Sequence, residues 1–198
     1  MKAELAELAV ADPPEPWAAL GFAVAGAHVD LGGIRVRLGA AGEGIVSWGV
    51  RGVEAGDIDG LVTAAAEGRE VSADPPHANG AVAIDHVVVL TPDFDRTAAA
   101  LAGAGMELRR VRDAGGSRQG FRRLGPAILE LVEEPGAPQG PARFWGLVVV
   151  VADLEALAER LGDRLGSVRD AVQPGRRIAT LRAGAGLGAA VAFMDPER

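Results

Sequence analysis

A β-branched run at residues 83–90 opens the most regular pattern in the chain, and such a run is typical of a buried strand. The segment Thr91-Pro-Asp93 follows and supplies helix-start chemistry: a capping side chain, a proline at the opening and an acid in the first turn. The predicted helix extends from residue 94 to about 101, where glycines end it. Turn signals then separate three predicted strands, at residues 107–112, 118–124 and 127–132. The pattern therefore predicts one unit with the order strand, helix, strand, strand, strand.

The same order returns from residue 144. A predicted strand at 147–151 leads to a capping aspartate, Asp153, and to a helix with leucines at helical spacing, Leu154, Leu157, Leu161 and Leu165. Three more strands are predicted, at residues 167–171, 177–181 and 190–194. Residues 111–114 and 168–171 both read Val-Arg-Asp-Ala, at corresponding places in the two units. The shared order and the shared sequence predict an internal repeat.

The N-terminal part fits the same plan with little sequence similarity. A short helix within residues 12–21 follows the first of four predicted strands, at 5–11, 28–31, 33–38 and 44–50. A stretch rich in proline, glycine, alanine and charge comes next, and its segment 74–80 cannot be helical because it contains two prolines and an Asn-Gly pair. We expect an N-terminal module at 1–55, a linker at 56–82 and a paired domain at 83–198, with modules at 83–135 and 143–196.

The predicted fold class is α+β, with repeated βαβββ modules that form a cupped mixed sheet. One such unit cannot bury its sheet alone, because a single helix covers only one face. Two paired units close the sheet around a shared cavity. A third unit then has to fold over the pair or pair with a second molecule, and for this reason we expect a homodimer.

Composition narrows the function classes. Of the 198 residues, 48% are hydrophobic and 24% are charged, as in ordinary soluble proteins, and the absence of cysteine excludes disulfides, thiolate catalysis, zinc ribbons and iron–sulfur clusters. No apolar run approaches the roughly 20 residues that span a bilayer, and the N-terminus does not resemble a signal peptide, so we expect a cytoplasmic protein without a membrane partner. The net charge of −7 argues against nucleic acid as a partner. Abundant glycine and alanine suggest a high-GC, bacterial source.

Two residues break the apolar pattern of the predicted strands. His86 shares a strand face with Val88 and Leu90, and Glu130 interrupts the apolar run 127–132. A buried charge must be paired, protonated or bound to a metal. Imidazole and carboxylate together suit a divalent cation such as zinc, nickel, iron or manganese. Three interpretations stay open: a structural histidine hydrogen-bonded to Glu130 or to the backbone, a pair of metal ligands, or direct contact with an organic ligand.

Arginine and aromatic side chains are the other candidates. Six arginines lie on two adjacent predicted strands, and those that point inward are suited to hold a carboxylate or a phenolate: Arg109, Arg110, Arg112, Arg118, Arg122 and Arg123. A purely solvent-exposed role is the alternative for this group. The predicted substrate-binding residues are Phe121, Arg123, Trp145 and Phe193, although large aromatic residues in strands often only pack in the core.

Three features resemble the vicinal oxygen chelate superfamily: the segment Ile84-Asp-His-Val-Val-Val, Asp93 just before a predicted helix, and the Ile-Leu-Glu-Leu-Val sequence around Glu130. This superfamily includes glyoxalase, the bleomycin-resistance proteins and the extradiol dioxygenases. The resemblance covers residues 83–195 and, less closely, 1–52. In that family the first strand of a module supplies a histidine ligand and the fourth a glutamate, so the resemblance assigns a metal to His86 and Glu130. It implies a divalent metal that acts as a Lewis acid on a small substrate.

The second module departs from the family pattern. The position equivalent to His86 is Gly146, seven residues before Asp153, and the place of Glu130 falls on Phe193 or Val191. The metal shell is therefore incomplete, and whether the protein is an enzyme stays open. We carry three hypotheses: a glyoxalase-like, metal-dependent lyase, isomerase or dioxygenase; a metal-free small-molecule binding protein of the drug-sequestering, resistance type; and a non-catalytic assembly module.

Overall fold

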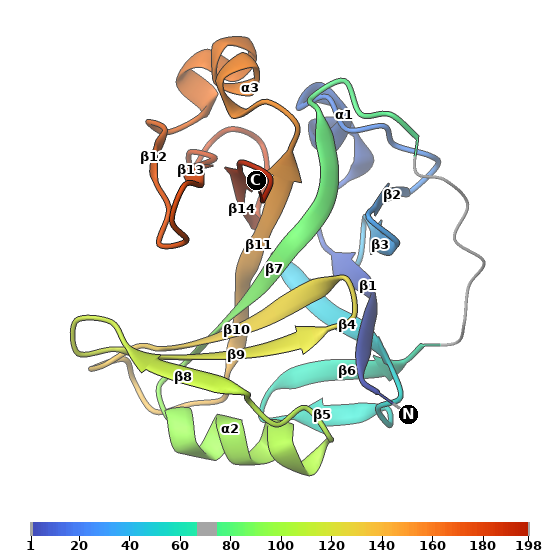
Figure 1. Cartoon of the computed structure of the whole chain (residues 1–198). Helices are drawn as coiled ribbons and strands as arrows, with labels where there is room; N and C mark the ends of the chain where they lie inside the picture. Colours follow the sequence, from blue (N-terminus) through green and yellow to red (C-terminus); the bar gives the residue numbers. More distant parts are fainter. Residues whose placement is uncertain (1, 67–74, 198) are drawn as a thin grey trace.

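Two β-sheets make up the computed structural model, which describes residues 2–66 and 75–197 (Figure 1). The N-terminal sheet has the order β2-β3-β1-β4-β6-β5. Its elements are β1 (Glu4–Val10), α1 (Pro14–Ala19), β2 (His28–Leu31), β3 (Ile34–Arg37), β4 (Ile45–Arg51), β5 (Gly56–Ile58) and β6 (Leu61–Ala65). The C-terminal sheet has eight strands in the order β12-β13-β14-β11-β7-β10-β9-β8. Its elements are β7 (Ala81–Thr91), α2 (Phe94–Gly103), β8 (Arg110–Asp113), β9 (Arg118–Leu124), β10 (Ala127–Glu133), β11 (Arg143–Val151), α3 (Leu154–Leu161), the 3-10 turn η1 (Gly162–Arg164), β12 (Arg169–Asp170), β13 (Arg177–Thr180) and β14 (Ala190–Met194).

The C-terminal sheet contains the two predicted βαβββ units. Within each unit the first and last strands pair in parallel, β7 with β10 and β11 with β14. The two first strands, β7 and β11, pair antiparallel at the centre of the sheet and run side by side through the molecule in Figure 1. The carboxylates of Asp93 and Asp153 accept hydrogen bonds from the backbone N–H groups of Arg96 and Ala156, so they cap α2 and α3; the cap at Asp153 is the one expected, and within the expected helix start 91–93 the cap is Asp93. The α+β class with repeated βαβββ modules is confirmed.

The N-terminal sheet repeats this arrangement in a reduced form. β1 pairs in parallel with β3, β4 pairs in parallel with β6, and β1 pairs antiparallel with β4. Its strand order therefore matches that of the six central strands of the C-terminal sheet, but no helix connects β4 to β5. This topology differs from the single module expected over 1–55, because β4 starts a second strand unit instead of ending the first.

The expected linker at 56–82 is partly strand. β5 and β6 pair with each other within it, and residues 67–74 of that range lie outside the described residues. These strands are short and bury few side chains, so their alternation does not stand out in the sequence. Farther along, His77 is buried and accepts a hydrogen bond from the backbone N–H of Ala23 at 2.9 Å, so the segment before β7 lies on the N-terminal part of the chain. The exact domain boundaries stay a prediction.

The two sheets share one hydrophobic core. Phe22 stacks on Phe193 with ring centroids 6.2 Å apart, and Trp48 meets Phe144 edge to face at 5.4 Å. The N-terminal strands are thus covered within the chain, so the expected homodimer no longer follows from an unpaired module and stays a prediction. Among residues 2–66 and 75–197, every helix is too short or too polar to span a membrane.

Candidate functional site

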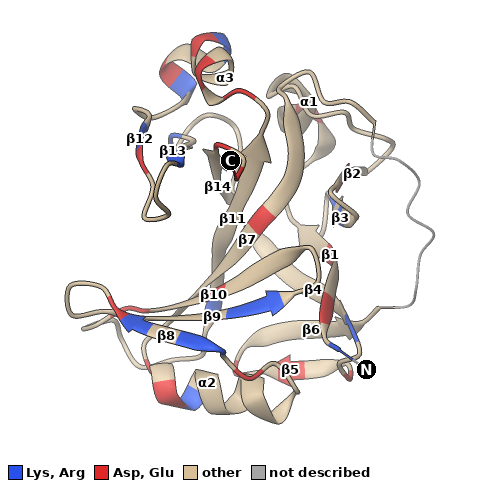
Figure 2. Cartoon of the chain, viewed as in Figure 1, with Lys and Arg blue, Asp and Glu red and all other residues tan. Residues whose placement is uncertain are grey.

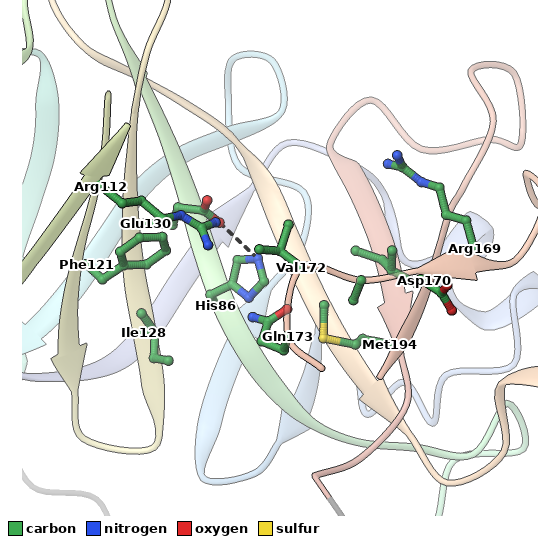
Figure 3. Close-up of a pocket in the computed structure, with 12 residues that line it drawn as sticks. His86, Arg112, Phe121, Ile128, Glu130, Arg169, Asp170, Val172, Gln173 and Met194 are labelled. Atoms are coloured by element: carbon green, nitrogen blue, oxygen red, sulfur yellow. Dashed lines mark ion pairs between the residues drawn. The ribbon is translucent and has the colours of Figure 1, made fainter. Parts of the chain in front are cut away.

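A cup on the open face of the C-terminal sheet gathers side chains from both βαβββ units (Figure 3). Its inner cavity measures about 170 Å³, and an adjoining compartment measures about 340 Å³. The two compartments adjoin each other and share five of their bordering residues: Arg112, Phe121, Ile128, Val172 and Gln173. His86 and Glu130 lie at the inner cavity, together with Met194 from β14. The cup is the cavity that pairing of two units predicts.

A β-bulge in β7 determines how the polar groups enter this cup. Val148 of β11 lies opposite His86, whereas the next residue, Val149, lies opposite Ile84. Asp85 is therefore the extra residue of the bulge. Bulges re-aim side chains, and here two consecutive residues border the cup: His86 at the inner cavity and Asp85 at the adjoining compartment.

A chain of four charged groups runs through the floor of the cup. His86 Nδ1 lies 2.8 Å from Asp85 Oδ2, and His86 Nε2 lies 3.2 Å from Glu130 Oε2, the ion pair dashed in Figure 3. Arg176 donates from Nη2 to Asp85 Oδ1 at 2.7 Å and from Nε to a backbone carbonyl. Both ring nitrogens of the histidine are thus engaged by carboxylates. The structural interpretation, a histidine paired with Glu130, matches this arrangement.

The carboxylates hold the histidine in its charged form. Burial alone would lower the pKa of His86, but the hydrogen bonds and charges of Asp85 and Glu130 raise it to about 9. Burial alone would raise the pKa of Asp85, but the hydrogen bonds from His86 and Arg176 lower it below its usual value. At neutral pH the cup floor therefore holds an imidazolium between two carboxylates.

The predicted substrate-binding residues do not all reach this cup. Phe121 borders both compartments. Arg123, two residues farther along β9, is exposed, does not border either compartment and donates to the carbonyl of Gly125. Trp145 is 38% exposed and borders a separate cavity of about 250 Å³ near the start of β14. Phe193 is fully buried on the opposite face of β14, where it packs against Phe22.

Strand register also fixes which residues of the second unit correspond to the candidate metal ligands. Glu130 lies opposite Val88, five residues before the helix cap of the first unit. The residue five before the second helix cap is Val148, and it lies opposite Ala192. The place of Glu130 is therefore occupied by Ala192, and neither Phe193 nor Val191, the two expected positions, faces the cup there.

The donor set does not fit the divalent metal that the family resemblance implies. His86 Nε2 and Glu130 Oε2 are close enough to share an ion, but the corresponding residues of the second unit, Gly146 and Ala192, have no donor atoms. The described residues contain no group of three or more His, Cys, Asp and Glu side chains placed to hold a metal. Catalytic metal sites usually have three protein ligands and an open position.

Asp85, Arg176 and Gln173 are among the cup residues that the sequence did not indicate. Asp85 reaches the cup only through the bulge, which no sequence pattern marks. Arg176 is 5% exposed, yet it belongs to a turn-rich stretch whose arginines are expected in solvent. Of the strand arginines, Arg112 borders both compartments, whereas Arg118 pairs with Glu133 on the surface.

Comparison with known proteins supports the fold. No family model matches the chain, and no curated protein matches its sequence. A methylmalonyl-CoA epimerase from Mycobacterium tuberculosis is similar in structure, with a TM-score of 0.51 and 19% identity over 60% of this chain and 91% of that one.

Two further epimerase structures give similar values. A Streptomyces coelicolor methylmalonyl-CoA epimerase variant in complex with 2-nitronate-propionyl-CoA has a TM-score of 0.48 and 20% identity over 58% of this chain and 94% of its own. A selenomethionine methylmalonyl-CoA epimerase has a TM-score of 0.49 and 16% identity over 60% and 97%. Together with the strand order of the C-terminal sheet, the similarity to the Mycobacterium tuberculosis enzyme shows that the chain has the fold of the vicinal oxygen chelate superfamily, as the sequence resemblance implies.

Proposed function

We propose that the cup binds a small organic molecule without a divalent metal ion. The donor set carries this proposal: among the described residues no three His, Cys, Asp or Glu side chains are placed to hold a metal together, and His86 and Glu130 are already paired with each other across the cavity floor. The imidazole lacks a free nitrogen, because its second ring nitrogen is bound to Asp85. A metal would have to displace this pairing and would then gain only two protein ligands.

The lining of the cup is typical of a small-ligand site. Phe121, Ile128, Ile178 and Met194 supply apolar walls, and a few polar groups are placed among them. The two adjoining compartments, of about 170 and 340 Å³, suit a molecule of one or two rings. The buried ion pair of His86 and Glu130 lies at the inner cavity, where it presents fixed charges to a ligand that enters.

Two measurements on the untagged chain test this proposal. Elemental analysis is expected to find no stoichiometric zinc, nickel, iron or manganese. A fragment library screened by ligand-observed NMR in the presence of EDTA is expected to yield ligands that an Ile128→Trp variant, which narrows both compartments, no longer binds. Val62→Trp is the matched control, because Val62 is exposed on β6 and borders neither compartment.

Two results would overturn the proposal. One is a metal ion present at one per chain that is lost in Glu130→Gln. The other is a library in which no fragment binds, or in which every fragment binds the Ile128→Trp variant as well as the wild type.

A further inference from the structure

We propose that the ligand of the cup is an organic carboxylate, and that Arg112 binds its carboxylate group. The inference rests on the proposed small-molecule function and names the chemical class of the ligand. It follows from a comparison of two arginines on the β8–β9 hairpin, where the ribbon of both strands carries basic positions, coloured blue in Figure 2.

Arg118 shows the complete arrangement. Its guanidinium carbon lies 4.6 Å from the ring centroid of Phe94, so the planar group rests on an aromatic face. Its nitrogens are then used by carboxylates: Glu133 accepts from Nε at 3.0 Å and from Nη2 at 2.9 Å, and Asp95 accepts from Nη1 at 2.8 Å. An aromatic ring positions the guanidinium, and carboxylate oxygens satisfy its donors.

Arg112 has the same arrangement without the carboxylate. Its guanidinium carbon lies 5.0 Å from the ring centroid of Phe121, and Nε donates to the amide oxygen of Gln119 at 2.8 Å. These two contacts hold the guanidinium plane in one orientation. Within the described residues no carboxylate pairs with its Nη1 and Nη2 atoms, although the side chain borders both compartments of the cup. The unused side of the guanidinium is therefore available to a ligand.

The surrounding charges favour an anion at this place. Glu130 and Asp85 are already matched by His86 and Arg176. Two further arginines, Arg110 and Arg169, border the cup and pair with no carboxylate in the described part of the chain. The acids Asp170 and Glu197 also border the cup, but both are exposed to solvent, which screens their charge.

Guanidinium binds a carboxylate through two parallel hydrogen bonds, and Phe121 beneath it offers a face for a ring. A carboxylate attached directly to a small ring satisfies both groups at once. The inner cavity, about 170 Å³ in volume, then accepts the ring against Ile128 and Met194.

A pair of probes with the same shape tests the charge requirement. Benzoate and benzamide differ mainly in charge, and each is titrated into the wild-type chain by chemical-shift perturbation in NMR. We expect benzoate to bind at least about tenfold more tightly, the worth of one charge-assisted hydrogen bond. Rising salt is expected to weaken benzoate binding and to leave benzamide binding unchanged.

Variants assign the preference to one side chain. Arg112→Gln is expected to remove the preference for benzoate, and Arg112→Lys, which keeps the charge but loses the planar fork, to retain part of it. Arg109→Gln is the matched control, because Arg109 is exposed on the same hairpin and pairs with Glu107. The control changes the net charge of the chain by the same amount and is expected to keep the full preference.

The possible outcomes distinguish a failure of the carboxylate inference from a failure of the proposed small-molecule function. Benzamide binding as tightly as benzoate, or an unchanged preference in Arg112→Gln, overturns the carboxylate inference and leaves the small-molecule function standing. A fragment library without any ligand for the cup overturns both. Circular dichroism of Arg112→Gln and Arg112→Lys checks that each variant chain remains folded, and the Lys variant keeps the inference testable if the Gln variant unfolds.

Discussion

The charge on His86 predicts how the stability of the protein depends on pH. Its pKa is about 6.5 in an unfolded chain and about 9 in the folded protein. A group whose pKa rises on folding stabilises the native state fully below the unfolded value, and this stabilisation is lost as the pH rises through the folded value. The free energy of unfolding should therefore fall between about pH 6.5 and about pH 9.

The size of the effect follows from the same two values. Each pKa unit corresponds to about 1.4 kcal/mol, so the difference for His86 is worth about 3 kcal/mol. The side chain is only 9% exposed, so water screens its contacts with Asp85 and Glu130 weakly. In a His86→Gln variant this pH-dependent contribution is absent, whereas all other titrating groups remain.

Urea unfolding followed by tryptophan fluorescence, from about pH 6 to about pH 10, measures the effect. The chain has no tyrosine and no cysteine and a single lysine, so few other groups titrate in this range. We expect the wild-type free energy of unfolding to fall by about 3 kcal/mol more than that of His86→Gln across this range. Equal pH slopes in the two proteins, or a wild-type stability that rises with pH, would refute the reasoning.

Three further substitutions test the packing and capping around the cup. Gly146→Ala would place a Cβ atom 2.0 Å from the carbonyl oxygen of Ala190, so it should lower the free energy of unfolding by about 3 kcal/mol. Gly140→Ala is the control and should leave stability unchanged, because nothing lies within 4 Å of the added Cβ. Equal melting temperatures for the two variants would contradict the strand register. Asp153→Ala removes the cap of α3 and should cost about 1 kcal/mol in urea unfolding, and no change would mean that the cap is not formed. Arg176→Met leaves the buried carboxylate of Asp85 with His86 as its one remaining charged partner and should cost about 3 kcal/mol by calorimetry, and a neutral result would place the Arg176–Asp85 ion pair in solvent.

The repeated units of the C-terminal sheet could be predicted because their signals are local and strong. The apolar run that precedes Asp93 identifies β7, and the aspartates that begin α2 and α3 identify the helices by capping chemistry. Such features depend only on neighbouring residues in the sequence, so they can be recognised without knowledge of the tertiary structure.

Strand pairing in the N-terminal half could not be predicted in the same way. β5 and β6 contain three and five residues, and their place beside β4 is decided by contacts with distant strands. A short strand with little apolar alternation does not differ from a loop in the sequence. Only the observed strand topology therefore shows that the N-terminal sheet contains two strand units, which pair through β1 and β4.

In the candidate site, too, some residues could be predicted from local sequence and others could not. The apolar pattern of the predicted strands singled out His86 and Glu130 as exceptions, and the structure places His86 Nε2 3.2 Å from Glu130 Oε2. Alternation failed where the register shifts by one residue, since a bulge or an offset moves a side chain to the other face. Asp85 enters the cup through such a bulge, and Phe193 packs on the core face because Ala192 occupies the cup position.

Nitrogen NMR of the histidine side chains tests the metal-free cup most directly. The chain has three histidines, so comparison with His86→Gln assigns the signals of His86 in long-range proton–nitrogen spectra. At about pH 7.5 we expect both ring nitrogens of His86 to be protonated, as between two carboxylates, and to remain so after one equivalent of zinc is added. An unprotonated Nε2 whose signal shifts on zinc addition would contradict the proposal and identify His86 as a metal ligand.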